Sequence, residues 1–168
     1  AINVAASFNT DLAYESSEIC AYESRAADCP WVYNPTIDLG RDPRWSRIWE
    51  SFGEDTYVNA EMGTAVVRGY QGNSHNAVGP NHTAACLKHY VGYGVPTSGK
   101  DRTPAIIAEN DLREKFFEPF RAAIVDGNAL SIMVNSGMIN GVSTHADYRL
   151  LTQWLKEDLD FDGVVVTD

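Results

Sequence analysis

Apolar positions along this chain follow two spacings in turn. In four stretches they recur every three to four residues, as on a helix with one buried face, and in four others they form short unbroken runs rich in β-branched residues. Polar capping residues and glycines mark where the helices begin and end. The predicted helices are 12–26, one from Glu54–Asp55 to Gly69 and Gly72, one from Asn110–Asp111 to Gly127, and 147–159. The predicted strands are 31–35, 84–87, 129–134 and 163–167.

Each predicted helix is followed by a strand, which gives four consecutive helix–strand units of the α/β class. Continuously apolar strands are typical of a parallel sheet covered on both faces, in a doubly wound sheet or a (β/α)8 barrel. Polar residues follow every strand, and a barrel gathers many strand ends at one centre, so we favour the barrel. Because such a barrel needs eight strands and roughly 250 residues, we expect this chain to be part of a TIM-type barrel whose open edges need the rest of it.

The composition and net charge of the chain limit the classes of molecule that it is expected to bind. The chain has 168 residues, 44% of them hydrophobic and 21% charged, with a formal net charge of -10. An acidic balance disfavours nucleic acid and anionic membranes and suits a neutral ligand such as a sugar. The start at Ala1, without an initiator Met or a signal-peptide pattern, resembles a cut, so localisation is not predicted from it.

The three cysteines, Cys20, Cys29 and Cys86, match neither a zinc pattern nor a CxxC motif. Free thiols are favoured over a disulfide between Cys20 and Cys29.

The segment from Asp38 to Glu50 carries three arginines, three carboxylates and two tryptophans in thirteen positions. Arginine offers a rigid fork of donors to sugar hydroxyls, and Trp45 or Trp49 would offer a flat apolar face to a sugar ring. An exposed loop held by weak ion pairs explains the same composition equally well.

Three further motifs lie at predicted strand ends. Lys88 and His89 are adjacent and both can donate to ligand hydroxyls, while the glycine-containing loop after them lacks the GxGxxG dinucleotide fingerprint. Residues 135–141 could line a second wall of a pocket, although Asn140–Gly141 is also a common turn. Asp168 ends a buried strand, where a carboxylate is costly unless it is paired, catalytic or caps a helix.

Four stretches of the chain together resemble glycoside hydrolase family 3, from about Ala5 to Asp168. They are GRDPRWSRIWESFGED, ACLKHY, NSGMINGV and GVVVTD, and GYGVPTSGKDRTP after the Lys–His pair resembles the β-glucosidase-type members. The resemblance implies that residues 1–168 are part of an N-terminal catalytic barrel. It also implies a second, α/β sandwich domain outside this chain that carries the acid/base Glu.

The resemblance further implies a role for individual residues. Asp168 corresponds to the nucleophile of a retaining, exo-acting β-glucosidase, and Arg47, Lys88 and His89 correspond to ligands of the terminal sugar. Lys100 and Arg102 lie near the position of another sugar-binding arginine, and Ser136 replaces a tyrosine near the nucleophile. The implied substrate is a β-glucoside or oligosaccharide, the implied location is secreted or periplasmic, and neither a metal nor an organic cofactor is implied.

Two other functions remain open at this point. A barrel lyase could form a Schiff base on Lys88, since lysines at strand ends become nucleophilic when desolvated. Alternatively the chain could be a sugar-binding relic without catalysis. The N-acetylglucosaminidase branch is set aside because the loop after Lys88–His89 has no further histidine.

Overall fold

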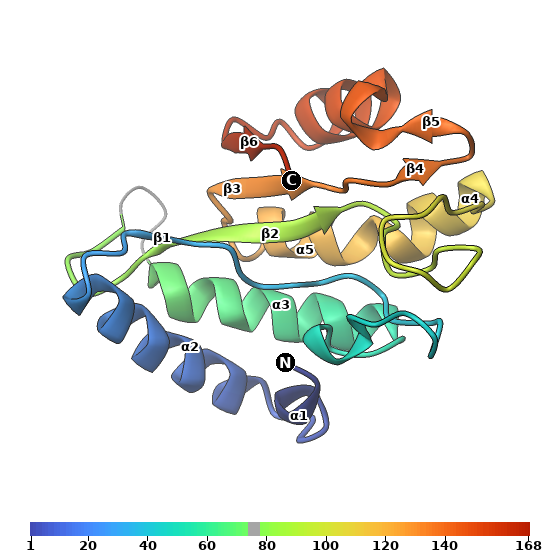
Figure 1. The fold of residues 1–168 in the computed structure, drawn as a ribbon. Coiled ribbons are helices and arrows are strands. Elements are labelled where there is room, and N and C mark those ends of the chain that lie inside the picture. Colours follow the sequence, from blue (N-terminus) through green and yellow to red (C-terminus); the bar gives the residue numbers. More distant parts are fainter. Residues whose placement is uncertain (74–77) are drawn as a thin grey trace.

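A computed structural model describes residues 1–73 and 78–168. Its centre is a four-stranded sheet in the order β1 (Trp31–Val32), β2 (Ala84–Tyr90), β3 (Ser131–Val134) and β6 (Val164–Val166). All three neighbouring pairs are parallel (Figure 1). Sequential parallel strands confirm the predicted series of helix–strand units.

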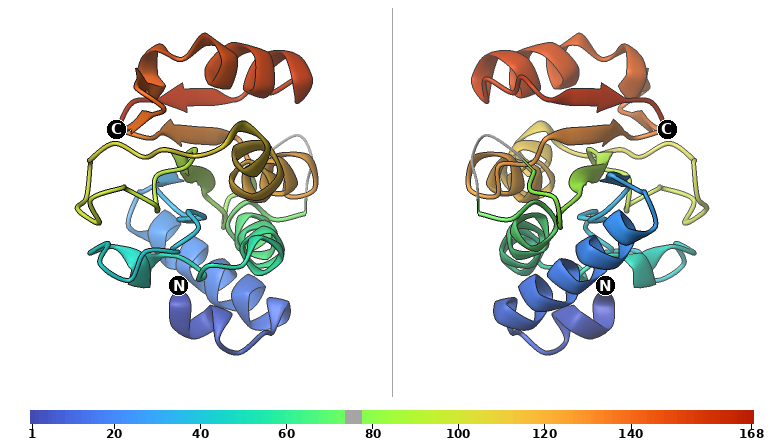
Figure 2. Two further views of the ribbon diagram at one scale, coloured as in Figure 1. Left: turned by 90° about the vertical axis from the view of Figure 1, so that its right-hand side faces the viewer. Right: turned by 90° about the vertical axis from the view of Figure 1, so that its left-hand side faces the viewer.

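Helices cover the sheet along one side. α2 (Thr10–Ala26) packs on α3 (Thr56–Gln71), α3 packs on α5 (Glu118–Val125), and η4 (Arg149–Asp158) lies over β6, as Figure 2 shows from both ends. α2 and α3 approach closely at Gly69, where an added Cβ would lie 2.4 Å from the carbonyl oxygen of Tyr14. The core between helices and strands includes fully buried side chains of Leu87, Ile132 and Phe120.

The first two predicted helices begin where their capping residues lie. The side chain of Asn9 accepts the backbone N–H groups of Asp11 and Leu12, and that of Asp55 accepts the N–H of Val58. These contacts satisfy donors that would otherwise lack partners at a helix start.

The later helices depart from prediction. The third region is a short α4 (Glu109–Asp111), then a wide π-type turn η2 (Leu112–Phe116), then α5, and its N-cap is Ala108 rather than Asn110–Asp111. The fourth helix, η4, is also π-type and starts at Arg149, with the carboxylate of Asp147 accepting the Leu150 N–H at 3.2 Å. Hydrophobic spacing does not distinguish π-type from α-helical turns over so few residues.

The first strand was predicted to end at Pro35, but its pairing with β2 continues beyond that residue. Pro35 does not stop the pairing with β2, because the Ile37 N–H donates to the Lys88 carbonyl at 2.9 Å. Proline is tolerated there because its missing donor is not needed, and the Lys88 N–H instead donates to the Pro35 carbonyl at 3.1 Å. The chain therefore runs beside β2 as far as Asp38.

The other elements are short. They are α1 (Ile2–Ala5), η1 (Ile48–Glu50), η3 (Thr144–Ala146) and a hairpin of β4 (Met138–Ile139) and β5 (Val142–Ser143), which was not predicted. Within residues 1–73 and 78–168, no helix has both the length and the apolar character to cross a membrane. Cys20, Cys29 and Cys86 are free thiols, which confirms the preference for unpaired cysteines.

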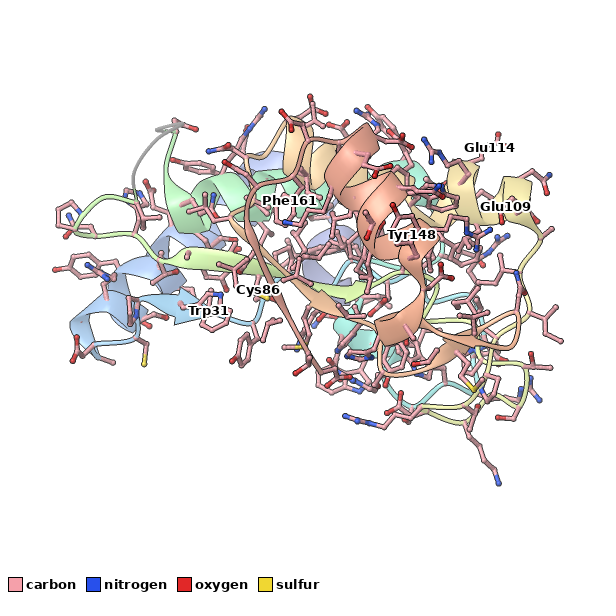
Figure 3. The ribbon with its side chains drawn as sticks, turned by 90° about the horizontal axis from the view of Figure 1, so that it is seen from above. Trp31, Cys86, Glu109, Glu114, Tyr148 and Phe161 are labelled. Atoms are coloured by element: carbon pink, nitrogen blue, oxygen red, sulfur yellow. The ribbon has the colours of Figure 1, made fainter. Side chains whose placement is uncertain are left out.

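The two ends of the sheet differ in chemistry. Figure 3 shows Trp31 beside Cys86 near the amino ends of the strands, where the Trp31 indole N–H donates to Ser131 Oγ at 2.8 Å. At the other end, the loops after β1, β2 and β3 gather, on the right-hand side of Figure 1. Ligands of parallel α/β folds bind at the carboxyl ends of strands, so this end is the candidate site.

Candidate functional site

A buried contact between Asp38 and His89 lies at the centre of this end. His89 Nδ1 is 2.8 Å from Asp38 Oδ2, and the backbone N–H of His89 donates to both oxygens of Asp38 at 3.2 Å. Both side chains are almost fully buried, 2% exposed for His89 and 0% for Asp38. The carboxylate therefore fixes the orientation of the imidazole and leaves Nε2 as the ring nitrogen that can face a ligand.

Lys88 precedes His89 at the end of β2 and is half-buried. Among the described residues, its ammonium group has no hydrogen bond or ion pair. Three N–H donors on a partly desolvated strand end are thus available to a polar ligand.

Arg47 forms a two-pronged pair with Glu50. Its Nε and Nη2 donate to the two carboxylate oxygens at 2.8 and 2.9 Å. These bonds lower the pKa of Glu50, as do the nearby charges of Lys88 and His89 to a smaller degree, and they raise the pKa of Arg47. Because Nη1 takes no part in this pair, Arg47 keeps donors for a ligand while its planar group is held in place.

Trp45 has a different role from the one its composition suggested. It is only 1% exposed, and its indole N–H donates to Asp101 Oδ1 at 2.8 Å. The prediction that Trp45 offers a face to a sugar is therefore wrong, because the ring is enclosed by the protein. Trp49 is 64% exposed and keeps a free face.

The ring of Tyr93 contacts Trp45, His89 and Arg47. The sequence pattern did not single out this residue. Its ring meets Trp45 edge-on at 5.5 Å between centroids, lies 4.6 Å from the His89 ring, and has the Arg47 Cζ atom 5.7 Å from its centroid. The only indication in the sequence was a tyrosine between two glycines, Gly92 and Gly94, in a loop after a polar strand end. Gly94 is required there, since a Cβ would lie 2.4 Å from the carbonyl oxygen of Leu39.

Two hydroxyl groups at this end are buried without a hydrogen-bond partner among the described residues, those of Tyr93 and Ser136. Burial raises the pKa of Tyr93 to about 12, and the nearby carboxylate of Asp101 adds to that increase. The Tyr93 hydroxyl lies near the polar groups of Asp101, Ser136 and Arg47 without forming a hydrogen bond of good geometry with them, so a small shift or a bound ligand would satisfy it.

The residues near Asp168 also differ from expectation. Arg102 Nη2 lies 3.6 Å from Asp168 Oδ1, and Arg102 Nε lies 3.9 Å from Asp101 Oδ2. Neither Lys88 nor Arg47 forms an ion pair with Asp168, and Arg47 is instead bound to Glu50. Lys100 is exposed, and of the two candidates in that loop it is Arg102 that pairs with Asp168.

The 135–141 segment is largely structural. The side-chain amide of Asn135 donates to the Val91 carbonyl at 2.9 Å, and that of Asn140 donates to the Ile107 carbonyl at 2.7 Å. Asn140 and Gly141 form the turn between β4 and β5, with positive φ angles of 51° and 86°. The turn interpretation of Asn140–Gly141 is thus confirmed.

No group of three or more metal-ligating side chains lies together within the described part of the chain. What the site offers is a set of donors, two of them fixed by carboxylates (Arg47 and His89) and one unpaired (Lys88), together with the buried hydroxyls of Tyr93 and Ser136. The loop from β2 also reaches a carboxylate at the end of β6. Such a set suits a neutral, hydroxyl-rich ligand beside an acidic group that can react.

Comparison with known proteins agrees with this chemistry. The model of the glycosyl hydrolase family 3 N-terminal domain matches residues 1–168, and the chain belongs to this family. The predicted fold is thereby confirmed, since that domain is a TIM-like barrel.

Individual relatives are also similar. The chain is 47% identical over 168 residues to a lysosomal beta glucosidase of Dictyostelium discoideum, covering 98% of this chain and 20% of the relative. It is 37% identical over 164 residues to a putative beta-xylosidase of Formosa agariphila, covering 98% and 22%. A solved b-glucosidase of Erythrobacter marinus superposes with a TM-score of 0.98 at 35% identity, covering 99% and 22%. The chain thus spans about a fifth of the length of the relatives it matches.

Proposed function

We propose that the protein containing this chain is a retaining, exo-acting β-glycosidase that removes terminal β-D-glucosyl residues, with Asp168 as its nucleophile. The observation that carries the proposal is the position of Asp168 at the end of β6. It lies on the same side of the sheet as the donors of β2 and of the loop after β1. Membership of a family of glycosyl hydrolases supports it, and leaves a Schiff base on Lys88 without support.

In the proposed first step, one oxygen of Asp168 attacks the anomeric carbon while an acid protonates the leaving oxygen. The bond between the anomeric carbon and the leaving oxygen breaks, and a glycosyl ester forms on Asp168. Water then hydrolyses this ester with retention of configuration. We propose that the acid/base is a Glu of a second domain outside residues 1–168, about 5–5.5 Å from the nucleophile as in other retaining enzymes.

The donors of the β1 and β2 loops hold the terminal sugar in this proposal. The sugar hydroxyls would be bound by Arg47 Nη1, the Lys88 ammonium and His89 Nε2. Glu50 fixes the guanidinium of Arg47, and Asp38 fixes the imidazole of His89. Hydroxyl contacts made away from the reacting carbon align it with the carboxylate and lower the barrier there. Ser136, in the place of a larger tyrosine, leaves its own hydroxyl for the ligand.

The location of the protein is proposed from its relatives. A lysosomal relative at 47% identity favours an enzyme outside the cytoplasm. We propose secretion or export to the periplasm, which cell fractionation with an activity assay would test.

A trapping experiment tests the nucleophile. The full-length protein would be incubated with a 2-deoxy-2-fluoro-β-glucosyl donor that has a good leaving group, and the Asp168 peptide analysed by mass spectrometry. We expect one fluoroglucosyl group on Asp168, its absence from Asp168→Asn, and unchanged labelling in Asp162→Asn, which alters an exposed carboxylate six residues earlier.

Two other results would change the proposal. A protein that hydrolyses β-glucosides but is labelled elsewhere would disprove the role of Asp168. Faster labelling by the matching 2-fluoroxylosyl donor would replace glucose with xylose as the preferred sugar, in line with the name of the Formosa relative.

A further inference from the structure

The contacts of Arg102 differ from those of Arg47, Lys88 and His89. Arg102 sits between two carboxylates, 3.9 Å from Asp101 and 3.6 Å from Asp168. Arg47 and His89 are each paired with a carboxylate of their own neighbourhood, Glu50 and Asp38, whereas Arg102 is paired with the proposed nucleophile itself. Arg102 instead directs its guanidinium at the one oxygen, Oδ1, that the structure places within reach.

The backbone of Arg102 is held in an unusual conformation. Its φ angle is 60°, in the left-handed region that residues other than glycine seldom adopt. The surrounding loop imposes this geometry through short local bonds: Thr97 N–H to the Pro104 carbonyl at 3.0 Å and Thr103 Oγ1 to the Lys100 carbonyl at 2.6 Å. Strained backbone maintained by its surroundings is concentrated at functional sites.

Asp101 is itself held in place by a hydrogen bond from a buried tryptophan. Trp45, 1% exposed, donates its indole N–H to Asp101 Oδ1, which leaves Oδ2 facing Arg102. Partial burial opposes ionisation of Asp101. The hydrogen bond from Trp45, the neighbouring Tyr93 and the charges of Arg47 and Arg102 outweigh it and lower the pKa of Asp101. The carboxylate is therefore ionised at neutral pH and attracts Arg102.

We infer that Arg102 is a positioning residue for Asp168, held in place by the Trp45–Asp101 hydrogen bond, and not a ligand of the sugar. This inference rests on the proposed function, since it assigns Arg102 to the proposed nucleophile. Arg102 holds Oδ1 and leaves Oδ2 to attack the anomeric carbon. A fixed carboxylate spends more of its time in a geometry that can react.

The test separates positioning from sugar binding. In the full-length enzyme, the maximal rate of fluoroglucosyl labelling of Asp168 reports attack, and the inhibition constant of glucose reports binding of the sugar. For Arg102→Gln we expect the labelling rate to fall by about 10- to 100-fold, the effect of a small misplacement of reacting groups, with the glucose constant unchanged within about twofold.

The supporting residues give a second, independent measurement. Asp101→Asn and Trp45→Phe should lower the same rate by about 3- to 10-fold, and combining Asp101→Asn with Arg102→Gln should add little to Arg102→Gln alone. The matched control is Arg121→Gln, which breaks a comparable arginine–carboxylate pair with Glu118 on α5. It should leave both quantities unchanged.

Other results would overturn the inference. If the inhibition constant of glucose rises in Arg102→Gln by as much as the labelling rate falls, Arg102 binds the sugar. An unchanged labelling rate in Arg102→Gln, or in Asp101→Asn, would remove the positioning role or its support. If the wild-type enzyme is not labelled at Asp168 at all, the proposed nucleophile fails, and that outcome is visible before any variant is made.

Discussion

The ends of β2 and β6 belong to the same candidate site but are organised very differently. At the end of β2, His89 and Asp38 are buried and joined by three contacts of 2.8 to 3.2 Å. At the end of β6, Asp168 forms an ion pair at 3.6 Å with Arg102, whose side chain is 58% exposed. The groups proposed to bind the sugar are thus preorganised by residues 1–73 and 78–168, and among these residues Arg102 is the cation paired with the proposed nucleophile.

The difference has a physical cause. A buried charge must be paired and hydrogen-bonded, so Asp38 and His89 constrain each other strongly. An exposed pair gains little free energy, so Arg102 influences the orientation of Asp168 more than it influences stability. Four variants test whether burial is the cause of this difference.

The largest effect is expected for Asp38→Ala. It leaves the buried His89 without its partner, and breaking such a pair costs about 3–5 kcal/mol of unfolding free energy. Denaturant unfolding of the full-length protein measures the loss. The exposed pair of Lys115 and Asp111 is the control, and Lys115→Ala should cost less than about 1 kcal/mol. Equal losses in both variants would show that burial of Asp38 contributes nothing.

A smaller effect is expected for Trp45→Phe. The substitution removes a hydrogen bond to an ionised carboxylate and leaves a small cavity in a buried place, which together should cost about 2–4 kcal/mol. Thermal unfolding measures it. A loss below about 0.5 kcal/mol would contradict the anchoring role given to Trp45.

The pair of Arg47 and Glu50 should give a pH-dependent effect. The pKa of Glu50 is lower in the folded protein than its unfolded value of about 4.3, so its contribution is present above that pH. This contribution is lost as the pH falls through the folded value. Glu50→Gln should therefore be less stable than wild type by about 1 kcal/mol at pH 7.

The difference between wild type and Glu50→Gln should shrink below about pH 4.3. Unfolding curves recorded between pH 3 and pH 7 test this direction. A difference that stays constant over that range would mean that the Arg47–Glu50 pair does not stabilise the fold.

The smallest effect is expected for Trp49→Phe, the matched partner of Trp45→Phe. Trp49 is 64% exposed, so its substitution should change stability by less than about 0.5 kcal/mol. A larger loss would show that Trp49 is covered in the full-length protein. A raised KM for longer oligosaccharides at unchanged stability would assign Trp49 to sugar contact.

Much of the fold was predictable because its rules are local. Hydrophobic spacing and caps such as Asp55 placed the helices, and unbroken apolar runs placed parallel strands in sequential order. The π-type turns of η2 and η4, the β4–β5 hairpin and the continued pairing past Pro35 were missed. Hydrophobic spacing does not separate π-type from α-helical turns, and two-residue strands are too short to show a period, whereas the pairing past Pro35 depends on contacts with β2 that the local pattern does not contain.

In the candidate site, too, some features were predictable from the sequence and others were not. Polar residues at strand ends, including Lys88, His89 and Asp168, stand out in the sequence because strand ends converge in any parallel sheet. Which groups touch was not predictable: Tyr93, the pairing of Asp38 with His89, and the burial of Trp45 against Asp101 all join loops far apart in the chain.

The sequence alone therefore determined the order of helices and strands, the polar character of one end of the sheet and the family resemblance, because these follow from local periodicity and motif spacing. Only the tertiary structure decided that Trp45 anchors Asp101 and that Arg102, rather than Lys100, faces Asp168. Those choices depend on how loops after different strands fold over one another, since the free energy of a polar group is set by the burial and partners it meets there.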